Sequence, residues 1–162
     1  MKFLDRQKRV AMMFEEDERG RIRQRYDGVD VKTLNPLVAA YVGDAYFHLF
    51  VRGRLLSYEQ SKVQALNQCS AQIVSAVWQA QAYRAIKSVL TAEEQSVFRW
   101  GRNAPSHAPR VASVQEYHIS TGFEALLGTL YLTGKFDRLQ DVAEAAFQAI
   151  VRQMMTDRQR PK

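Results

Sequence analysis

Two carboxylates stand out because each is the single acid in a stretch that is otherwise apolar enough to form a protein core. Asp44 lies in A-Y-V-G-D-A-Y-F-H, residues 40–48, and Glu124 lies in S-T-G-F-E-A-L-L-G-T-L-Y-L-T-G, residues 120–134. An ionised carboxylate in such surroundings costs several kcal/mol unless it is paired or bound to a metal. Both residues therefore require a partner.

The two acids can lie close together and bind the same metal ion. Gly43 directly precedes Asp44, and Gly128 lies one helical turn after Glu124, so two helices can cross closely at these glycines. Mg²⁺ prefers oxygen ligands and is typically held by one or two carboxylates together with water and substrate phosphate. A metal so held activates a bound water and polarises a phosphodiester. The pattern predicts a site for Mg²⁺, with Mn²⁺ as the alternative ion, at Asp44 and Glu124.

Other chemistries find less support in the sequence. His48 lies one turn after Asp44, so a simple hydrogen bond between them, or an exposed polar strip, is an alternative to a metal site. Cys69, the single cysteine, has no histidine near it in the sequence. The chain also lacks a glycine-rich phosphate loop and the Cys/His spacing of a zinc site.

Composition limits the class of protein. A length of 162 residues suits one domain with a core of its own. A single cysteine excludes an internal disulfide and fits a reducing compartment, so we expect a cytoplasmic protein. We find no transmembrane stretch or signal peptide and expect no membrane association. The net charge of +6 favours a polyanionic partner.

Gly and Pro are scarce, at 8 and 4 residues, and the apolar residues repeat at helical spacing, so we expect an all-α fold. Asn35 before Pro36 is typical of a helix start, and Thr91 with Glu94 forms a capping-box sequence. The stretch 101–113, which has two prolines and no acid, is expected to be a loop. Helices are expected over about 4–25, 36–54, 58–90 (one helix, or two with a break near Asn67), 91–100, a segment ending near 132, and 136–155.

Three blocks of the chain, taken together, resemble the ribonuclease III catalytic domain, and most closely its small branch, the Mini-ribonuclease III family. The blocks are N-P-L-V-A-A-Y-V-G-D-A from Asn35, R-W-G-R-N-A from Arg99, and the Glu124 segment from Ser120. The likeness covers residues 34–155, which leaves 1–33 as a charged, helical N-terminal extension and 156–162 as a basic tail.

The resemblance implies a helical bundle that forms a two-fold dimer and hydrolyses double-stranded RNA with Mg²⁺, without an appended double-stranded RNA-binding domain. It also implies a role in trimming large-subunit (23S-type) ribosomal RNA precursors. The larger ribonuclease III pattern has two further acids where this chain has Ala40 and Thr121, and the resemblance implies that the small branch tolerates both changes. A catalytically silent scaffold for RNA or ribosome assembly, and a purely structural helical dimer, remain the alternatives.

Candidate RNA contacts are basic residues near the expected loop and the end of the Asp44 helix. Arg99, Arg102, Asn103 and Arg110 offer three positive charges and an amide without a nearby acid, although a solvated connector has the same composition. Arg52 and Arg54 follow the Asp44 segment, where they either reach flanking phosphates or stabilise a helix C-terminus.

Overall fold

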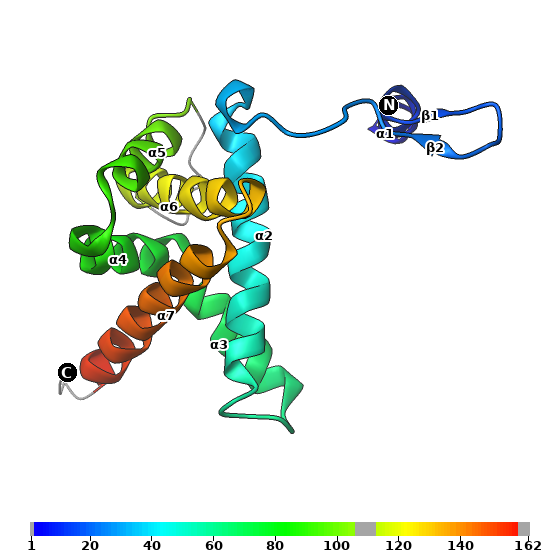
Figure 1. The fold of residues 1–162 in the computed structure, drawn as a ribbon. Helices are drawn as coiled ribbons and strands as arrows, with labels where there is room; N and C mark the ends of the chain where they lie inside the picture. Colours follow the sequence, from blue (N-terminus) through cyan, green and yellow to red (C-terminus); the bar gives the residue numbers. More distant parts are fainter. Residues whose placement is uncertain (1, 106–112, 159–162) are drawn as a thin grey trace. The chain divides into compact units, whose positions relative to one another are not determined.

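The computed structural model describes residues 2–105 and 113–158 and divides the chain into two compact units, 1–30 and 31–162. The described part is mainly α-helical, which confirms the predicted fold class (Figure 1). None of its helices is long and apolar enough to cross a lipid bilayer. The second unit consists of α2 (Pro36–Leu55), α3 (Val63–Ile73), α4 (Ala76–Ile86), α5 (Ala92–Arg102), α6 (Val114–Leu132) and α7 (Phe136–Arg158), with 3₁₀ turns at Val31–Thr33 and Lys87–Val89.

Local capping fixes the starts of three helices that carry the site. The Asn35 side chain accepts a hydrogen bond from the backbone N–H of Leu37 at 2.9 Å, with Pro36 as the first residue of α2. Thr91 forms the predicted capping box with Glu94 at the start of α5. Ser113 begins α6 in the same way.

The helix break expected near Asn67 falls instead at Ser75. Asn67 lies within α3, which runs to Ile73. Ser75 has an extended backbone, with φ of −66° and ψ of 152°, and its carbonyl accepts the first hydrogen bond of α4, from the N–H of Gln79 at 2.9 Å. The segment 58–90 thus forms two α-helices, as one of the two predicted alternatives allowed, but with a different boundary.

The prediction of a single helix over residues 4–25 is wrong. In the N-terminal unit, α1 (Lys2–Met13) is followed by a hairpin of β1 (Glu15–Glu16) and β2 (Ile22–Arg23). The Asp17 carboxylate accepts hydrogen bonds from the backbone N–H groups of Arg19 and Arg21, both at 2.9 Å, and Gly20 has a positive φ of 71°. These local bonds and the left-handed glycine favour a turn over a continued helix.

The core of the second unit is built around α6, which packs against α2, α4, α5 and α7. Figure 1 shows α6 crossing α2, with α5 alongside α6. Three fully buried phenylalanines join these helices: Phe47 of α2 meets Phe123 of α6 edge to face at 5.3 Å between ring centroids, and Phe147 comes from α7. Glu124, next to Phe123, is therefore held on the most enclosed helix of the unit.

Candidate active site

The predicted crossing of two glycine-containing helices is present in the structure. A Cβ atom at Gly43 of α2 would overlap the carbonyl oxygen of Glu124 and would lie 2.6 Å from the backbone nitrogen of Gly128. A Cβ atom at Gly128 of α6 would likewise overlap the carbonyl oxygen of Ala39. Only glycine permits this backbone contact. The contact places the residue after Gly43, which is Asp44, against the turn of α6 that carries Glu124.

Asp44 lies at the accessible side of this crossing. Its side chain is 49% exposed, and its Oδ1 is 3.3 Å from Nε2 of His48 one turn along α2. The contact between Asp44 and His48 that the sequence suggested as an alternative is therefore present. It is long, and it involves only one of the two carboxylate oxygens. The exposed remainder of the carboxylate is available to a metal ion or to solvent.

Glu124 lies deeper, and its ionisation is unfavourable. Burial, together with the negative charge of Asp44, raises the pKa of Glu124 to about 8, and hydrogen bonding from Gln79 opposes the increase. Without a cation, Glu124 is therefore largely protonated at neutral pH. Because the negative charge of Asp44 contributes to this increase, a divalent cation between the two groups would favour the ionised form of Glu124.

The donor set fits a water-rich magnesium site. The two acids supply hard carboxylate oxygens, and among the described residues no cluster of three or more Asp, Glu, His or Cys side chains is placed to bind a metal. Ala40 is buried in a cluster with Ala39 and Ala125, and the buried Thr121 hydroxyl donates to the Tyr117 carbonyl oxygen at 3.0 Å. Two protein carboxylates leave most positions of an octahedral ion to water and substrate phosphate.

The basic end of α5 lies beside the Glu124 helix. Gly101 fits against α6, where an added Cβ would be 3.1 Å from the Thr121 carbonyl oxygen and from Cα of Gly122. Arg99 and Arg102 flank this glycine and are exposed. The contact places Gly101, which lies between two of the predicted RNA-binding cations in the sequence, against residues 121–125 of α6.

A cavity of about 480 Å³ lies at this end of α5, lined by Arg102, Asn103, Ala104, Pro105, Gln115 and His118. The structure therefore adds Gln115 and His118, from the first turns of α6, to the predicted Arg102 and Asn103. The Nδ1 atom of His118 is buried and has no hydrogen-bond partner among the described residues. Nothing in the sequence around His118 marks it as a residue of this cavity. Arg110 lies outside the described residues.

Arg52 and Arg54 occupy different environments in the last turn of α2. Arg52 is exposed. Arg54 forms a two-pronged ion pair with Glu144 of α7, in which Nε donates to Oε2 at 2.7 Å and Nη2 donates to Oε1 at 2.8 Å. Its guanidinium also lies 5.6 Å from the ring centroid of Phe147. Arg54 thus links α2 to α7, and its donors are used within the protein.

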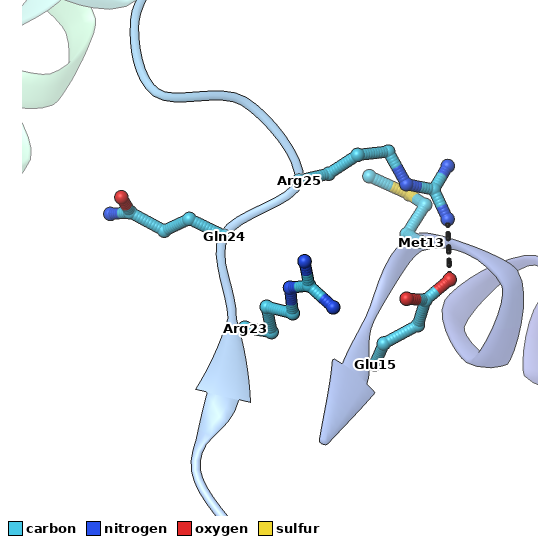
Figure 2. Close-up of a pocket in the computed structure, with 5 residues that line it drawn as sticks. All are labelled: Met13, Glu15, Arg23, Gln24 and Arg25. Atoms are coloured by element: carbon cyan, nitrogen blue, oxygen red, sulfur yellow. Dashed lines mark hydrogen bonds and ion pairs between the residues drawn. The ribbon is translucent and has the colours of Figure 1, made fainter. Parts of the chain in front are cut away.

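The N-terminal unit has a separate small cavity of about 160 Å³, shown in Figure 2. It is lined by Met13, Glu15, Arg23, Gln24 and Arg25, and its one carboxylate, Glu15, is 3.3 Å from Nη2 of Arg25. A single acid already paired with an arginine is a poor cation ligand. The crossing of α2 and α6 is therefore the better candidate for the catalytic site.

Comparison with known proteins agrees with this site. Residues 37–135, which contain both acids, match the Ribonuclease III domain family. The chain belongs to the ribonuclease III family, whose members act on double-stranded RNA and in general depend on divalent metal ions.

The curated relatives identify the branch as Mini-ribonuclease III. The chain is 46% identical to the Mini-ribonuclease 3 of Symbiobacterium thermophilum over 121 residues, 74% of this chain and 93% of that protein. It is 40% identical to the Mini-ribonuclease 3 of Thermoanaerobacter sp. over 121 residues, 74% of this chain and 85% of that protein. The crystal structure of protein FN1578 from Fusobacterium nucleatum matches with a TM-score of 0.66 and 26% identity, over 74% of this chain and 96% of that chain.

Proposed function

We propose that this endoribonuclease uses Mg²⁺, with Mn²⁺ as a substitute, bound by Asp44 and Glu124, to cleave double-stranded or structured RNA in the cytoplasm. The substrate proposed is precursor ribosomal RNA of the large subunit (23S-type), in keeping with the likeness to Mini-ribonuclease III. The observation that supports the site is the glycine crossing of α2 and α6, which brings together two acids that each stand alone in an apolar segment.

The two acids have different tasks in this proposal. A bound divalent cation supplies an activated water and neutralises charge on the phosphodiester. Asp44, half exposed, offers its carboxylate to the metal from the accessible side. Glu124, held by the backbone contact at Gly128, offers the second carboxylate from the enclosed side. The scissile phosphate must therefore approach past Asp44.

RNA is held by the basic end of α5 and by Arg52. A-form RNA is recognised mainly through its phosphates, its 2′-hydroxyls and its shape. Exposed Arg99 and Arg102 flank the glycine that packs on the Glu124 helix, and Asn103 caps α5 beside them. We retain Arg110 as a candidate from the sequence alone, whereas the pairing of Arg54 with Glu144 favours a structural role for Arg54.

Replacing Arg102 by Ala is expected to weaken binding of duplex RNA without changing thermal stability, because the side chain is exposed and lines the cavity next to α6. The slope of log affinity against log salt should fall by about one, the value for one lost phosphate contact. Arg152→Ala, which removes an exposed arginine from α7, is the matched control. An unchanged salt slope in Arg102→Ala would exclude this residue from the RNA interface.

A homodimer is the proposed assembly, and an uncovered stripe on α2 supports it. Val38, Tyr41 and Leu49 follow one face of α2 and are 46%, 78% and 71% exposed in the single chain. A stripe of this kind is typically covered by a partner, and a two-fold dimer covers it on both copies.

Replacing Leu49 by Glu is expected to convert a particle of twice the chain mass into a monomer, because the substitution places a charge in the uncovered stripe. Light scattering or sedimentation at micromolar concentration measures this change. Val63→Glu, at a residue 70% exposed at the start of α3, is the control and should leave the mass unchanged. A wild-type monomer with full cleavage activity would contradict the proposed dimer.

Cleavage of a long RNA duplex tests the proposed activity, with the single strand of the same sequence as control. Cutting of the duplex with Mg²⁺, and none with a chelator, is expected. Binding without cutting would favour the catalytically silent scaffold instead. Cutting of a large-subunit precursor at a defined position, in contrast to scattered cutting of an unrelated duplex, tests the ribosomal assignment.

A further inference from the structure

The N-terminal unit, residues 1–30, lies outside the residues that match the Ribonuclease III domain family. Its side chains are described for residues 5–30, and none of these is buried; only Asp17 is partly enclosed. A unit of this length is usually too small to build a hydrophobic core. Its apolar side chains are therefore available to a binding partner.

These apolar side chains gather along one groove. The groove has a volume of about 720 Å³, within the range of ligand-binding pockets. It is formed by residues 13–14 and the segment 22–29, and its large apolar residues are 51–76% exposed: Met13, Phe14, Ile22, Tyr26 and Val29. Apolar surface that is exposed and gathered in one hollow indicates a binding site.

The charged residues of the groove favour an anionic ligand. Two arginines and one acid line it: Arg23, Arg25 and Asp27. Nη2 of Arg25 is 3.3 Å from Oε1 of Glu15, so this guanidinium is already paired. The Arg23 guanidinium forms no ion pair or hydrogen bond with the described residues, and Figure 2 marks a contact for Arg25 and none for Arg23. Arg23 is thus a free cation within an apolar groove.

Exposed aromatic rings beside a free arginine suit unpaired RNA. Proteins hold single strands by stacking bases on aromatic side chains and by pairing phosphates with cations. In a duplex the base faces are already stacked on one another, so aromatic rings cannot reach them. Phe14 and Tyr26 supply the rings here, and Arg23 supplies the cation. A purely apolar protein segment would leave the guanidinium of Arg23 without a partner.

We propose that the groove of the N-terminal unit binds a single-stranded stretch of RNA, with bases stacked on Phe14 and Tyr26 and a phosphate paired with Arg23. The enzyme then recognises a duplex that continues into an unpaired strand, because two sites on one chain bind one RNA more tightly than either site alone. This substrate class rests on the proposed cleavage of duplex RNA and adds an unpaired extension to it.

The test compares a blunt RNA duplex with the same duplex carrying a single-stranded extension of about ten uridines, a length within the usual site size for single strands. Binding to the full chain is measured by fluorescence anisotropy in the presence of a chelator, so that neither RNA is cut. Wild type should bind the extended duplex about tenfold more tightly than the blunt duplex. The ratio of the two affinities within one variant cancels any change in duplex binding.

Tyr26→Leu should lower this ratio about fivefold, because leucine keeps an apolar side chain and removes the ring that stacks on a base. Tyr26→Phe keeps the ring and should keep the ratio. Tyr26 is 76% exposed, so neither change removes a buried contact. Arg23→Ala should also lower the ratio, whereas Arg19→Ala, at an exposed arginine outside the groove, should not.

Equal binding of both RNAs by wild type would overturn the single-strand site, as would an unchanged ratio in both Tyr26→Leu and Arg23→Ala. In either case an apolar protein segment becomes the better occupant of the groove. Cleavage of the blunt duplex with Mg²⁺ is the separate readout for the proposed function. If wild type prefers the extended RNA but does not cut the duplex, the proposed catalytic function is wrong and the groove remains an RNA site. If wild type cuts the duplex without preferring the extension, the groove proposal alone is wrong.

Discussion

Asp44→Asn and Glu124→Gln are each expected to reduce cleavage of duplex RNA by a factor of about a thousand. Each substitution keeps the shape of the side chain and removes one of the two carboxylates that we propose as metal ligands at the crossing. Metal stabilisation of a transition state is worth several kcal/mol, and about 4 kcal/mol corresponds to three powers of ten in rate. Rates at saturating RNA and Mg²⁺ measure the effect.

Folding and RNA binding are the controls for these two variants. Glu124→Gln should not destabilise the metal-free protein, because burial and the charge of Asp44 already disfavour the ionised form of Glu124. Both variants should bind duplex RNA through the basic end of α5 as wild type does. Asp137→Asn, an exposed acid in the first turn of α7, should cleave normally. Cleavage at the wild-type rate by either ligand variant would remove that residue from the catalytic site.

The helix crossing was predictable because its signals are local. An acid next to a glycine within an apolar helical run is visible in ten residues of sequence, as at Gly43 and Asp44. Its meaning depends on a second acid, Glu124, which has a glycine one helical turn later at Gly128, and the structure brings the two segments together through backbone contacts. Helix starts at Asn35 and Thr91 were predictable for the same reason, since capping joins residues two or three apart.

Contacts between distant residues were not predictable in this way. Arg54 and Glu144 are ninety positions apart, and nothing near Arg54 in the sequence shows that its guanidinium is already paired. Gln79 is buried in α4 and donates to the Val74 carbonyl oxygen, and the sequence does not show that this position is enclosed. The prediction of one helix over 4–25 is wrong for a different reason. The apolar residues at helical spacing end with α1, and Asp17 and Gly20 after it favour a turn more strongly than a helix.

Gly43→Ala is expected to destabilise the protein by about 3 kcal/mol and to lower Tm by about 10 °C. The added methyl group would overlap the carbonyl oxygen of Glu124, which belongs to the backbone of the central helix and cannot rotate away as a side chain would. The two helices must separate to admit it. Separation also moves Asp44 from Glu124, so the Mg²⁺ concentration needed for cleavage should rise in whatever fraction remains folded.

Gly53→Ala is the matched control, because the same change is made on the same helix. A Cβ atom at Gly53 meets nothing within 4 Å, and its φ is not positive. Alanine there should raise stability by about 0.5–1 kcal/mol, since it restricts the unfolded chain and favours helix. Opposite signs for the two substitutions in urea unfolding would identify close backbone contact, and not helix propensity, as the reason for glycine beside Asp44. Equal stability of Gly43→Ala and Gly53→Ala would show that α2 and α6 do not cross at Gly43, and the pairing of the two acids would lose its structural basis.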